Sequence, residues 1–196
     1  MNKEWSGRWF RRRGFADFLI QDLTIRRFIE KGIEKTAAVG KVEIERRGET
    51  LKIILHSAKP GILIGRAGSG LLLFKEKLMK AVANLPKQTE IEVQEISEPD
   101  LKASLLAVKI AQQLEGRMNF RRTAKMALDR LLEARIKGAK IILAGRLGGA
   151  EIAREVAFKF GALPTARLKE KIDFAKSEAQ TKWGTIGIKV WIYKGE

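Results

Sequence analysis

Three groups of residues in this sequence have the types and spacing that suit contact with phosphate. The first is the run Ile64-Gly65-Arg66-Ala67-Gly68. Without a Cβ on the two glycines, a phosphate backbone can come close to the main chain. A helix that starts after the loop would present unpaired N–H groups to that phosphate. We expect Gly65, Arg66, Ala67 and Gly68 to bind nucleic acid. The alternative is a helix–helix turn that uses glycine for steric reasons.

The second group is Arg121, Arg122 and Lys125. At about 100° per residue in a helix, these cations fall within one arc of about 100°. The apolar residues of the same segment occupy a different arc, so the helix would pack one face and direct the cations outward. Asp129 is the one acid near this face, which favours phosphate contact over pairing within the chain. A solvated charged face is the alternative.

The third group, Gly145-Arg146-Leu147-Gly148-Gly149, follows a predicted strand. We expect a helix at 150–160 to come next, so that strand, glycines and helix form a phosphate-binding turn. The run matches neither the dinucleotide fingerprint nor the Walker A loop. A strand-to-helix turn packed tightly on a sheet explains it equally well. The candidate phosphate contacts are Gly145, Arg146, Gly148, Gly149 and Arg154.

A basic, aromatic arm is expected at residues 1–14. Its arginines are further candidate phosphate contacts, namely Arg8, Arg11, Arg12 and Arg13. Four tryptophans have rings that can stack on bases, although packing in a core or an interface explains each of them as well. They are Trp5, Trp9, Trp183 and Trp191.

The charge of the chain favours an acidic partner. Its 39 basic and 23 acidic residues leave a net charge of +16. Such a charge repels itself unless nucleic acid or an anionic membrane surface meets it. The first 98 residues carry 19 basic and 13 acidic groups, and the remaining 98 carry 20 and 10. Because both halves are basic, we expect both to touch the partner.

Several other classes are disfavoured. The absence of cysteine excludes disulfides, thiolate zinc sites and a cysteine nucleophile. The single histidine, His56, suits a surface or core role better than a catalytic base, and Glu43 and Glu45 suit a solvated strand face. No apolar run is long enough to span a bilayer, and the basic start lacks the features of a signal peptide. We expect no cofactor and no metal, and we predict that the protein is not an enzyme.

Apolar periodicity predicts the elements that must position these groups. In the first half we expect a helix at 15–34, strands at 39–45 and 51–55, a short helix before the glycine loop, a helix from 70 to about 85 capped by Ser69, and a strand at 89–96. In the second half we expect helices at 101–114 and 121–136, a strand at 139–143, the helix at 150–160, and strands at 165–175 and 185–193. The last strand alternates cleanly, with Thr185, Lys189, Trp191 and Tyr193 on one face and isoleucine and valine on the other.

The order of elements in the first half matches a known RNA-binding module. The glycine loop lies between two helices, after two strands and before a third. This is the arrangement of the KH domain, whose Gly-x-x-Gly loop clamps about four nucleotides.

Four stretches together carry a more specific resemblance. They are Pro60-Gly61-Ile62-Leu63-Ile64-Gly65, Met118-Asn119-Phe120-Arg121-Arg122-Thr123-Ala124-Lys125, Gly145-Arg146-Leu147-Gly148-Gly149-Ala150-Glu151-Ile152-Ala153-Arg154, and the segment 184–196. In this order and spacing, over nearly the whole chain, the sequence closely resembles the family of bacterial small-subunit ribosomal protein three. The run at 145–154 is much more specific than the Gly-x-x-Gly loop.

The resemblance implies an α+β fold of two layers. After the arm at 1–14, a type II KH domain is expected at 15–98. A C-terminal α/β domain, with two helices packed on a mixed sheet, is expected at 99–196. The family further implies a structural constituent of the head of the small ribosomal subunit, in the cytoplasm. Its implied partners are small-subunit rRNA, mRNA, ribosomal proteins ten and fourteen in the head, and ribosomal proteins four and five at the mRNA entrance.

The resemblance also implies roles for two of the three groups. Carried over by motif, Arg121, Arg122 and Lys125 contact incoming mRNA at the entrance pore and help to separate its paired regions. The loop Gly65–Gly68 matches the KH loop of the family. A second cation is common in that loop, but Ala67 stands here, so we expect a weaker grip on RNA.

Three rival interpretations remain open from the sequence. A free KH-type RNA chaperone or ribosome assembly factor would use the same loop and the same charge. A nuclease or lyase would need a metal site or an activated base, and the acids form no convincing cluster for either. A membrane-surface protein would use the basic, aromatic start of the chain.

Overall fold

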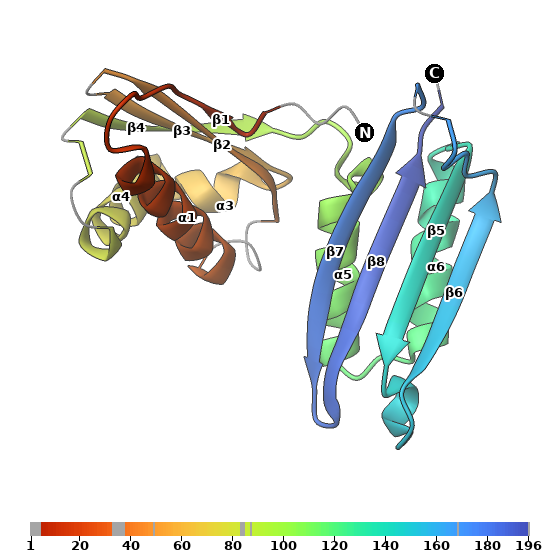
Figure 1. The fold of residues 1–196 in the computed structure, drawn as a ribbon. Coiled ribbons are helices and arrows are strands. Elements are labelled where there is room, and N and C mark those ends of the chain that lie inside the picture. The colour runs from red at the N-terminus through yellow and green to blue at the C-terminus, as the bar shows by residue number, and fades with distance from the viewer. Residues whose placement is uncertain are drawn as a thin grey trace. The chain divides into compact units, whose positions relative to one another are not determined.

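The computed structural model describes residues 5–32, 38–48, 50–82, 85–86, 88–167 and 169–195, with the backbone alone for residues 30–32 and 67. The chain forms two compact units, and the boundary between them in the sequence falls between Ser97 and Glu98. Each unit has a four-stranded sheet and a hydrophobic core of its own. Figure 1 shows the helices and strands of both.

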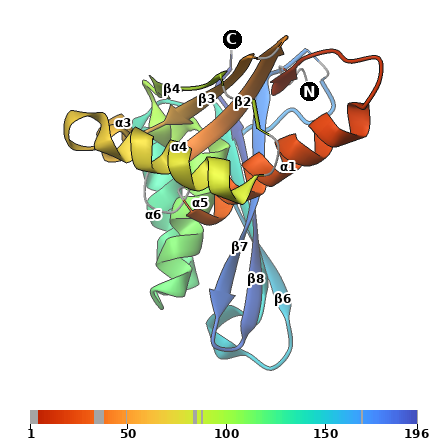
Figure 2. The ribbon, with the colours of Figure 1, turned by 90° about the vertical axis from the view of Figure 1, so that its left-hand side faces the viewer.

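The first unit contains a mixed sheet covered on one face by helices (Figures 1 and 2). Its strands lie in the order β1-β2-β3-β4. Strands β2 and β3 are antiparallel, whereas β1 runs parallel to β2 and β4 parallel to β3. The elements are β1 (Gly7–Arg8), α1 (Phe15–Gly32), β2 (Val39–Arg47), β3 (Thr50–Ser57), α3 (Pro60–Ile64), the 3-10 turn η1 (Arg66–Gly68), α4 (Ser69–Ala81) and β4 (Gln88–Glu95).

Apolar side chains at helical and strand spacing form the core of this unit. Ile25 and Ile29, one turn apart on α1, and Leu78 on α4 are almost completely buried against β3 residues such as Ile53. Because side chains alternate along a strand, the intervening residues of β2, β3 and β4 point away from the helices. The helix, strand, strand, helix, helix, strand order expected for a KH domain is therefore present.

The start of the described chain packs on the first unit. Strand β1 pairs with β2, and the Trp9 indole Nε1 donates a hydrogen bond of 2.7 Å to Asp22 Oδ2 on α1. Asp22 Oδ1 accepts a second one, of 2.6 Å, from the buried guanidinium of Arg46 on β2. The rings of Phe15 and Phe18 lie against Trp9. Trp9 thus has a structural role that explains it without base stacking.

The second unit is a two-layer sandwich of two helices on one sheet (Figure 1). The strand order is β6-β5-β8-β7, and every pairing is antiparallel. The mixed sheet expected for this C-terminal domain is therefore wrong. Among the described residues its strands pair antiparallel, and the mixed sheet belongs to the first unit. The elements are the 3-10 turn η2 (Pro99–Leu101), α5 (Ala103–Glu115), α6 (Phe120–Glu133), β5 (Gly138–Gly145), the 3-10 turn η3 (Leu147–Gly149), β6 (Arg154–Gly161), β7 (Ile172–Thr181) and β8 (Gly184–Tyr193).

The alternation predicted for the last strand is confirmed. Ile186, Ile188, Val190 and Ile192 of β8 are buried against α5 and α6. Asp173 links β7 to the start of α5, because its Oδ2 accepts a hydrogen bond of 2.9 Å from the backbone N–H of Ala103. The sheet therefore has one face covered by helices and one face that carries Thr185, Lys189 and Trp191.

Three sequence-based expectations for local structure are wrong. Residues 150–160 form no helix, because from Arg154 they are strand β6, in which Val156, Phe158 and Phe160 alternate inward and pack on the core. Strand β7 begins at Ile172, and residues 165–167 and 169–171 precede it as turns and irregular chain. Ser69 does not cap α4 but is its first residue, preceded by Gly68 at the N-cap.

Candidate nucleic-acid interface

The glycine loop is a tight corner between α3 and α4. Gly65 ends α3 with φ 69° and ψ −174°, and its N–H donates to the carbonyl of Gly61. A single 3-10 turn follows, and Gly68 then adopts the left-handed conformation with φ 79° and ψ 2°. The Ser69 hydroxyl donates a hydrogen bond of 2.8 Å to the carbonyl oxygen of Arg66 and so braces the corner. The side chain of Arg66 is exposed.

The two glycines of the loop meet different surroundings. A Cβ added at Gly65 would lie 2.9 Å from the backbone nitrogen of Gly70, whereas a Cβ added at Gly68 would meet nothing within 4 Å. At Gly70 a Cβ would lie 2.5 Å from the carbonyl oxygen of Leu63. Gly65 and Gly70 thus allow α3 and α4 to approach each other. Gly68 leaves an open space beside the loop, where a phosphate can come close to the main chain.

Exposed aliphatic side chains flank this loop. Ile62 on α3 and Leu72 and Leu73 on α4 are each more than half exposed, at 51%, 64% and 56%. Apolar side chains grouped on a surface often mark a binding site. The loop therefore combines a cation, an accessible main chain and apolar surface, which suits phosphate and base contact together.

Helix α6 presents the predicted cations to solvent. Arg121, Arg122 and Lys125 are all exposed, while the opposite side of the helix, including Ala124 and Leu131, is buried in the core. Arg121 lies with its guanidinium carbon 5.6 Å from the centre of the Phe120 ring. Within the part of the chain that the structure describes, none of the three side chains forms an ion pair with a carboxylate.

The start of α6 is fixed by a side-chain cap. Asn119 occupies the N-cap, and its Oδ1 accepts a hydrogen bond of 2.9 Å from the backbone N–H of Arg121. This type of cap typically contributes about 1 kcal/mol to helix stability. The cap and the buried face together hold the three cations in a fixed row on the helix surface.

The third glycine group has a different geometry from the one expected. It joins two strands of a hairpin, β5 and β6, rather than a strand and a helix. A Cβ at Gly148 would lie 3.8 Å from the ring of Phe120, the first residue of α6, so the start of that helix lies beside the turn. A Cβ at Gly145 would lie 2.9 Å from the carbonyl oxygen of Thr185, and one at Gly149 would lie 3.3 Å from the Trp183 ring. The glycines therefore allow this turn to pack closely on the β7–β8 turn.

Arg146 in this turn already has backbone partners. Its Nε donates a hydrogen bond of 2.9 Å to the carbonyl of Ala150, and one terminal nitrogen lies 3.5 Å from the carbonyl of Trp183. Arg154, at the start of β6, is exposed. Arg146 therefore has partners within this tightly packed turn, and its contact with phosphate, like that of Arg154, stays a prediction.

The four arginines at residues 8–13 differ in whether their side chains have partners within the chain. Arg8 lies 3.4 Å from Glu45 Oε1, and the Arg11 guanidinium carbon lies 4.2 Å from the centre of the Phe18 ring. Arg12 and Arg13 are exposed, and within the described residues no carboxylate pairs with them. The last two are therefore better placed for phosphate contact than the first two.

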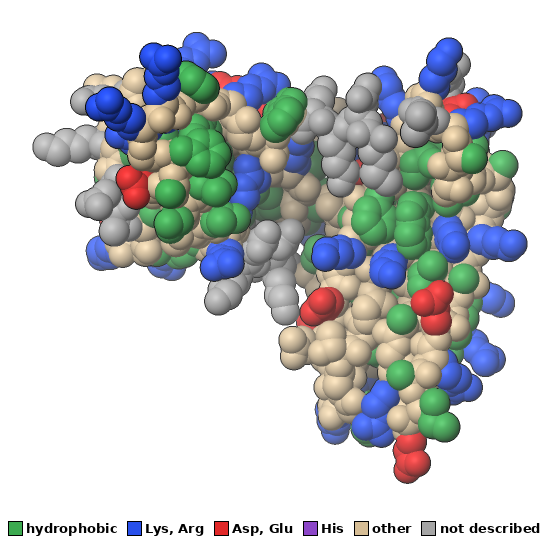
Figure 3. Space-filling view, viewed as in Figure 1, with side chains coloured by type: hydrophobic (Ala, Val, Ile, Leu, Met, Phe, Trp, Pro, Cys, Tyr) green, Lys and Arg blue, Asp and Glu red, His purple; other side chains and the backbone are tan. Residues whose placement is uncertain are grey.

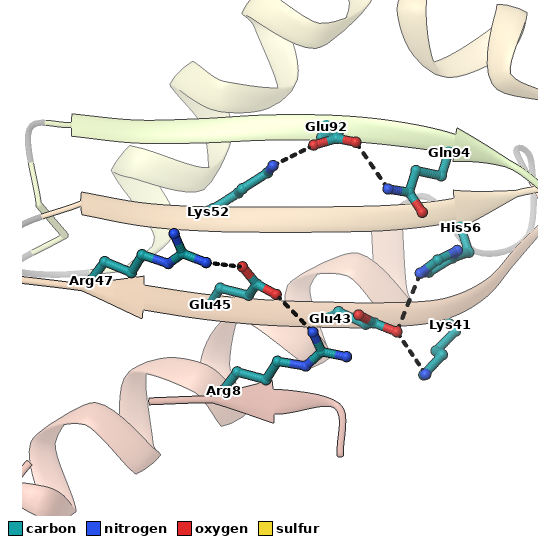
Figure 4. Close-up of polar contacts among 9 residues, drawn as sticks. All are labelled: Arg8, Lys41, Glu43, Glu45, Arg47, Lys52, His56, Glu92 and Gln94. Carbon is teal, nitrogen blue, oxygen red and sulfur yellow. Dashed lines mark hydrogen bonds and ion pairs between the residues drawn. The ribbon is translucent and has the colours of Figure 1, made fainter. Parts of the chain in front are cut away.

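The outer face of the first sheet carries mixed charges that pair with one another (Figure 4). Lys41 Nζ lies 2.6 Å from Glu43 Oε1, and this hydrogen bond holds the pKa of Glu43 below its usual value. His56 Nε2 lies 3.4 Å from the same oxygen. Glu43 is buried, with 9% of its surface exposed, and His56 Nε2 is buried without a hydrogen-bond partner among the described residues, so the solvated face expected for Glu43 is wrong.

A second pair lies across the same face. Lys52 Nζ is 2.6 Å from Glu92 Oε2, and Gln94 donates a hydrogen bond of 2.9 Å to Glu92 Oε1. The hydrogen bonds from Gln94 and Lys52 lower the pKa of Glu92, and the bond to Glu92 raises the pKa of Lys52.

Among the described residues no three His, Asp or Glu side chains form a group able to hold a metal ion. No described helix is long and apolar enough to cross a membrane.

Comparison with known proteins decides the family. Residues 24–101 match the model of the KH domain, and residues 110–192 match that of "Ribosomal protein S3, C-terminal domain". A small ribosomal subunit protein uS3 of Clostridium botulinum is 43% identical over 195 residues, which cover 99% of this chain and 86% of the relative. The chain belongs to the uS3 family of small ribosomal subunit proteins. This confirms the family resemblance stated from the sequence motifs.

Other relatives agree. The uS3 protein of Exiguobacterium sibiricum is 44% identical over 196 residues, which cover 99% of this chain and 88% of that protein. The one of Brevibacillus brevis is 43% identical over 195 residues, with 99% and 86% covered. As a member of this family of ribosomal structural proteins, the chain is not an enzyme. The α+β fold class and the KH domain followed by the S3 C-terminal domain are likewise confirmed.

The sequence motifs did not single out every part of the surface. The contact of Trp183 with Gly149 and the pairing of β1 with β2 were both missed. So was the basic face of the second sheet, which includes Lys140, Lys159 and Lys176. The alternation of 185–193, which placed Lys189 and Trp191 on one face, was the signal that pointed to it.

Proposed function

We propose that this protein is a structural constituent of the small ribosomal subunit and acts there as an RNA-binding protein. The KH unit contacts small-subunit rRNA through the loop Gly65–Gly68, and other ribosomal proteins adjoin it. The proposal includes ribosomal proteins ten and fourteen in the head of the subunit, and four and five at the mRNA entrance. Family membership and the net charge of +16 support it.

We further propose that α6 lines the pore through which mRNA enters. One observation carries this step: Arg121, Arg122 and Lys125 form an exposed cationic row on a capped, well-buried helix. A row of fixed cations binds phosphates irrespective of sequence, as a channel for every mRNA requires. By holding single strands, the row favours the unpaired form of an incoming hairpin. No nucleotide hydrolysis is needed for this effect.

The test replaces Arg121, Arg122 and Lys125 together by alanine. Subunits assembled with the variant should retain their composition but translate through a stable mRNA hairpin more slowly than through an unpaired message. In direct binding, the dependence of the association constant on salt should weaken, with the slope falling by about 2 for three lost contacts with single-stranded RNA.

The matched control removes three exposed cations elsewhere on the same unit: Lys102, Lys169 and Lys182. It should leave hairpin passage unchanged. If both triple variants slow hairpins equally, or neither does, the role of α6 is contradicted. Sedimentation of the wild-type chain tests the broader proposal, because a free RNA chaperone or assembly factor would remain outside mature subunits after a high-salt wash.

A further inference from the structure

The outer face of the second sheet combines aromatic rings with lysines. One row of directly opposed residues crosses all the strands, from Phe174 on β7 through Trp191 on β8 and Lys140 on β5 to Lys159 on β6. The next row on this face contains Lys176 on β7 directly opposite Lys189 on β8. Figure 3 shows hydrophobic side chains over β7 and β8, with Lys and Arg side chains beside them across the sheet. We use the name sheet surface for the six residues of these two rows, Phe174, Trp191, Lys140, Lys159, Lys176 and Lys189.

The lysines of the sheet surface repel one another and so lower the stability of the unbound protein. Lys176 and Lys189 face each other across β7 and β8, and Lys140 and Lys159 face each other across β5 and β6. Like charges directly opposite in an antiparallel pair destabilise a sheet. Within the described residues, no carboxylate pairs with any of the four, and Glu155 and Glu178 lie in the following row. An anion on this surface would relieve the repulsion.

The aromatic pair adds a second kind of contact. The ring centres of Phe174 and Trp191 are 5.0 Å apart, and both side chains remain partly exposed. The ammonium of Lys140 lies 5.5 Å from the centre of the Trp191 ring. Rings on the open face of a four-stranded sheet, bordered by cations, provide stacking for bases and charge for the phosphates between them.

We propose that the sheet surface binds single-stranded RNA, with Phe174 and Trp191 stacking on bases and the four lysines contacting phosphates. Single strands fit better than a duplex because the base faces of a duplex are already stacked. They fit better than an acidic protein because acidic side chains would leave the two rings without a function. The sheet surface lies on the face opposite α6 in the same unit (Figure 1). The proposal therefore adds a site to the two already described and does not depend on the role of α6.

The first experiment maps contacts directly. A 12-nucleotide oligouridylate carrying 5-bromouridine is irradiated with the full chain, and the crosslinked residues are identified by mass spectrometry. Crosslinks at Phe174 or Trp191 are expected, and they should be lost on competition with unmodified oligouridylate. Crosslinks confined to the KH loop and α6 would overturn the proposal. Equal competition by an RNA duplex or by polyglutamate would also overturn it.

The second experiment measures affinity at matched salt in the Arg121→Ala, Arg122→Ala, Lys125→Ala background, so that α6 does not contribute. Phe174→Leu keeps an apolar side chain but removes the stacking ring, and should weaken oligouridylate binding about tenfold. The double change Lys176→Ala, Lys189→Ala should lower the salt slope by about 1.4.

The control for the lysines is Lys102→Ala, Lys182→Ala, which removes the same charge from outside the sheet surface and should leave the slope unchanged. Thermal melting checks that each variant is folded. Unchanged affinity in folded Phe174→Leu would contradict the stacking role. Equal slopes for the two double variants would contradict the phosphate contacts. Because α6 is silent in this background, either result leaves the function proposed for α6 unaffected.

Discussion

At the scale of single residues, the two glycines of the KH loop show how one motif serves packing and binding separately. Gly65 has a backbone conformation that is essentially confined to glycine, and a Cβ there would strike the backbone of Gly70. Gly68 is left-handed but faces open space. The first glycine therefore holds α3 against α4, while the second keeps the ligand side of the loop clear.

These roles predict that substitutions at Gly65 mainly affect stability and that substitutions at Gly68 mainly affect RNA binding. Gly65→Ala should lower the free energy of unfolding by about 2–3 kcal/mol, because strained backbone and a steric clash combine. Gly68→Ala should cost only about 1 kcal/mol, the price of a left-handed alanine. Gly68→Asp should fold comparably to Gly68→Ala but bind RNA more weakly, since it puts a negative charge where phosphate sits.

Urea unfolding and RNA titration at one fixed salt concentration separate the two effects. Gly68→Ala is the matched control for Gly68→Asp, because both share the backbone strain and differ in charge. Equal RNA affinity of the Gly68→Asp and Gly68→Ala variants would show that phosphate does not approach Gly68.

At the scale of elements, the spacing of apolar residues predicted most helices and strands. It did not predict which distant residues each turn contacts. The buried arc of α6 and the alternation of β8 follow directly from residue spacing. Strand β6 was mistaken for a helix because glycines before Glu151 and Arg154 resemble a helix start, whereas the decisive pattern is the period of two in Val156, Phe158 and Phe160. Likewise, no local signal shows that Arg146 bonds to carbonyls, one of them 37 residues away.

The outer face of the first sheet provides a prediction about pH. The hydrogen bond from Lys41 lowers the pKa of Glu43 in the folded protein relative to the ordinary value of 4.5. The pair therefore stabilises the fold above that value, and the stabilisation is lost as the pH falls through the lowered pKa. Lys41→Ala should reduce the free energy of unfolding by about 0.5 kcal/mol at pH 7. The difference from wild type should shrink as the pH is lowered below 4.5.

Urea unfolding at a series of pH values measures this difference. Lys182→Ala, in the turn between β7 and β8, removes an exposed lysine with no carboxylate partner among the described residues, and it should show no such loss at low pH. A Lys41→Ala effect that stayed constant down to pH 2.5 would mean that the pair does not stabilise the folded state.

At the scale of the whole molecule, the chain consists of two units with separate cores. Leu78 is fully buried in the core of the first unit and Leu131 in that of the second. Each unit also carries its own candidate RNA contacts, namely the KH loop in the first and α6 with the sheet surface in the second. On the functions proposed above, two linked basic units would each hold a segment of RNA, which gives binding beyond that of either unit alone.

Separate cores predict separate unfolding transitions. Leu78→Ala and Leu131→Ala each remove a fully buried side chain, which typically costs 2–5 kcal/mol. Four tryptophan indole signals report the outcome by NMR during urea unfolding, with Trp5 and Trp9 in the first unit and Trp183 and Trp191 in the second. Leu78→Ala should move the first two to lower urea and leave the others in place, and Leu131→Ala should do the reverse. Each variant is the control for the other. If all four signals shift together in both variants, the two units unfold as one cooperative body, and contacts between them must then contribute stability comparable to that of each core.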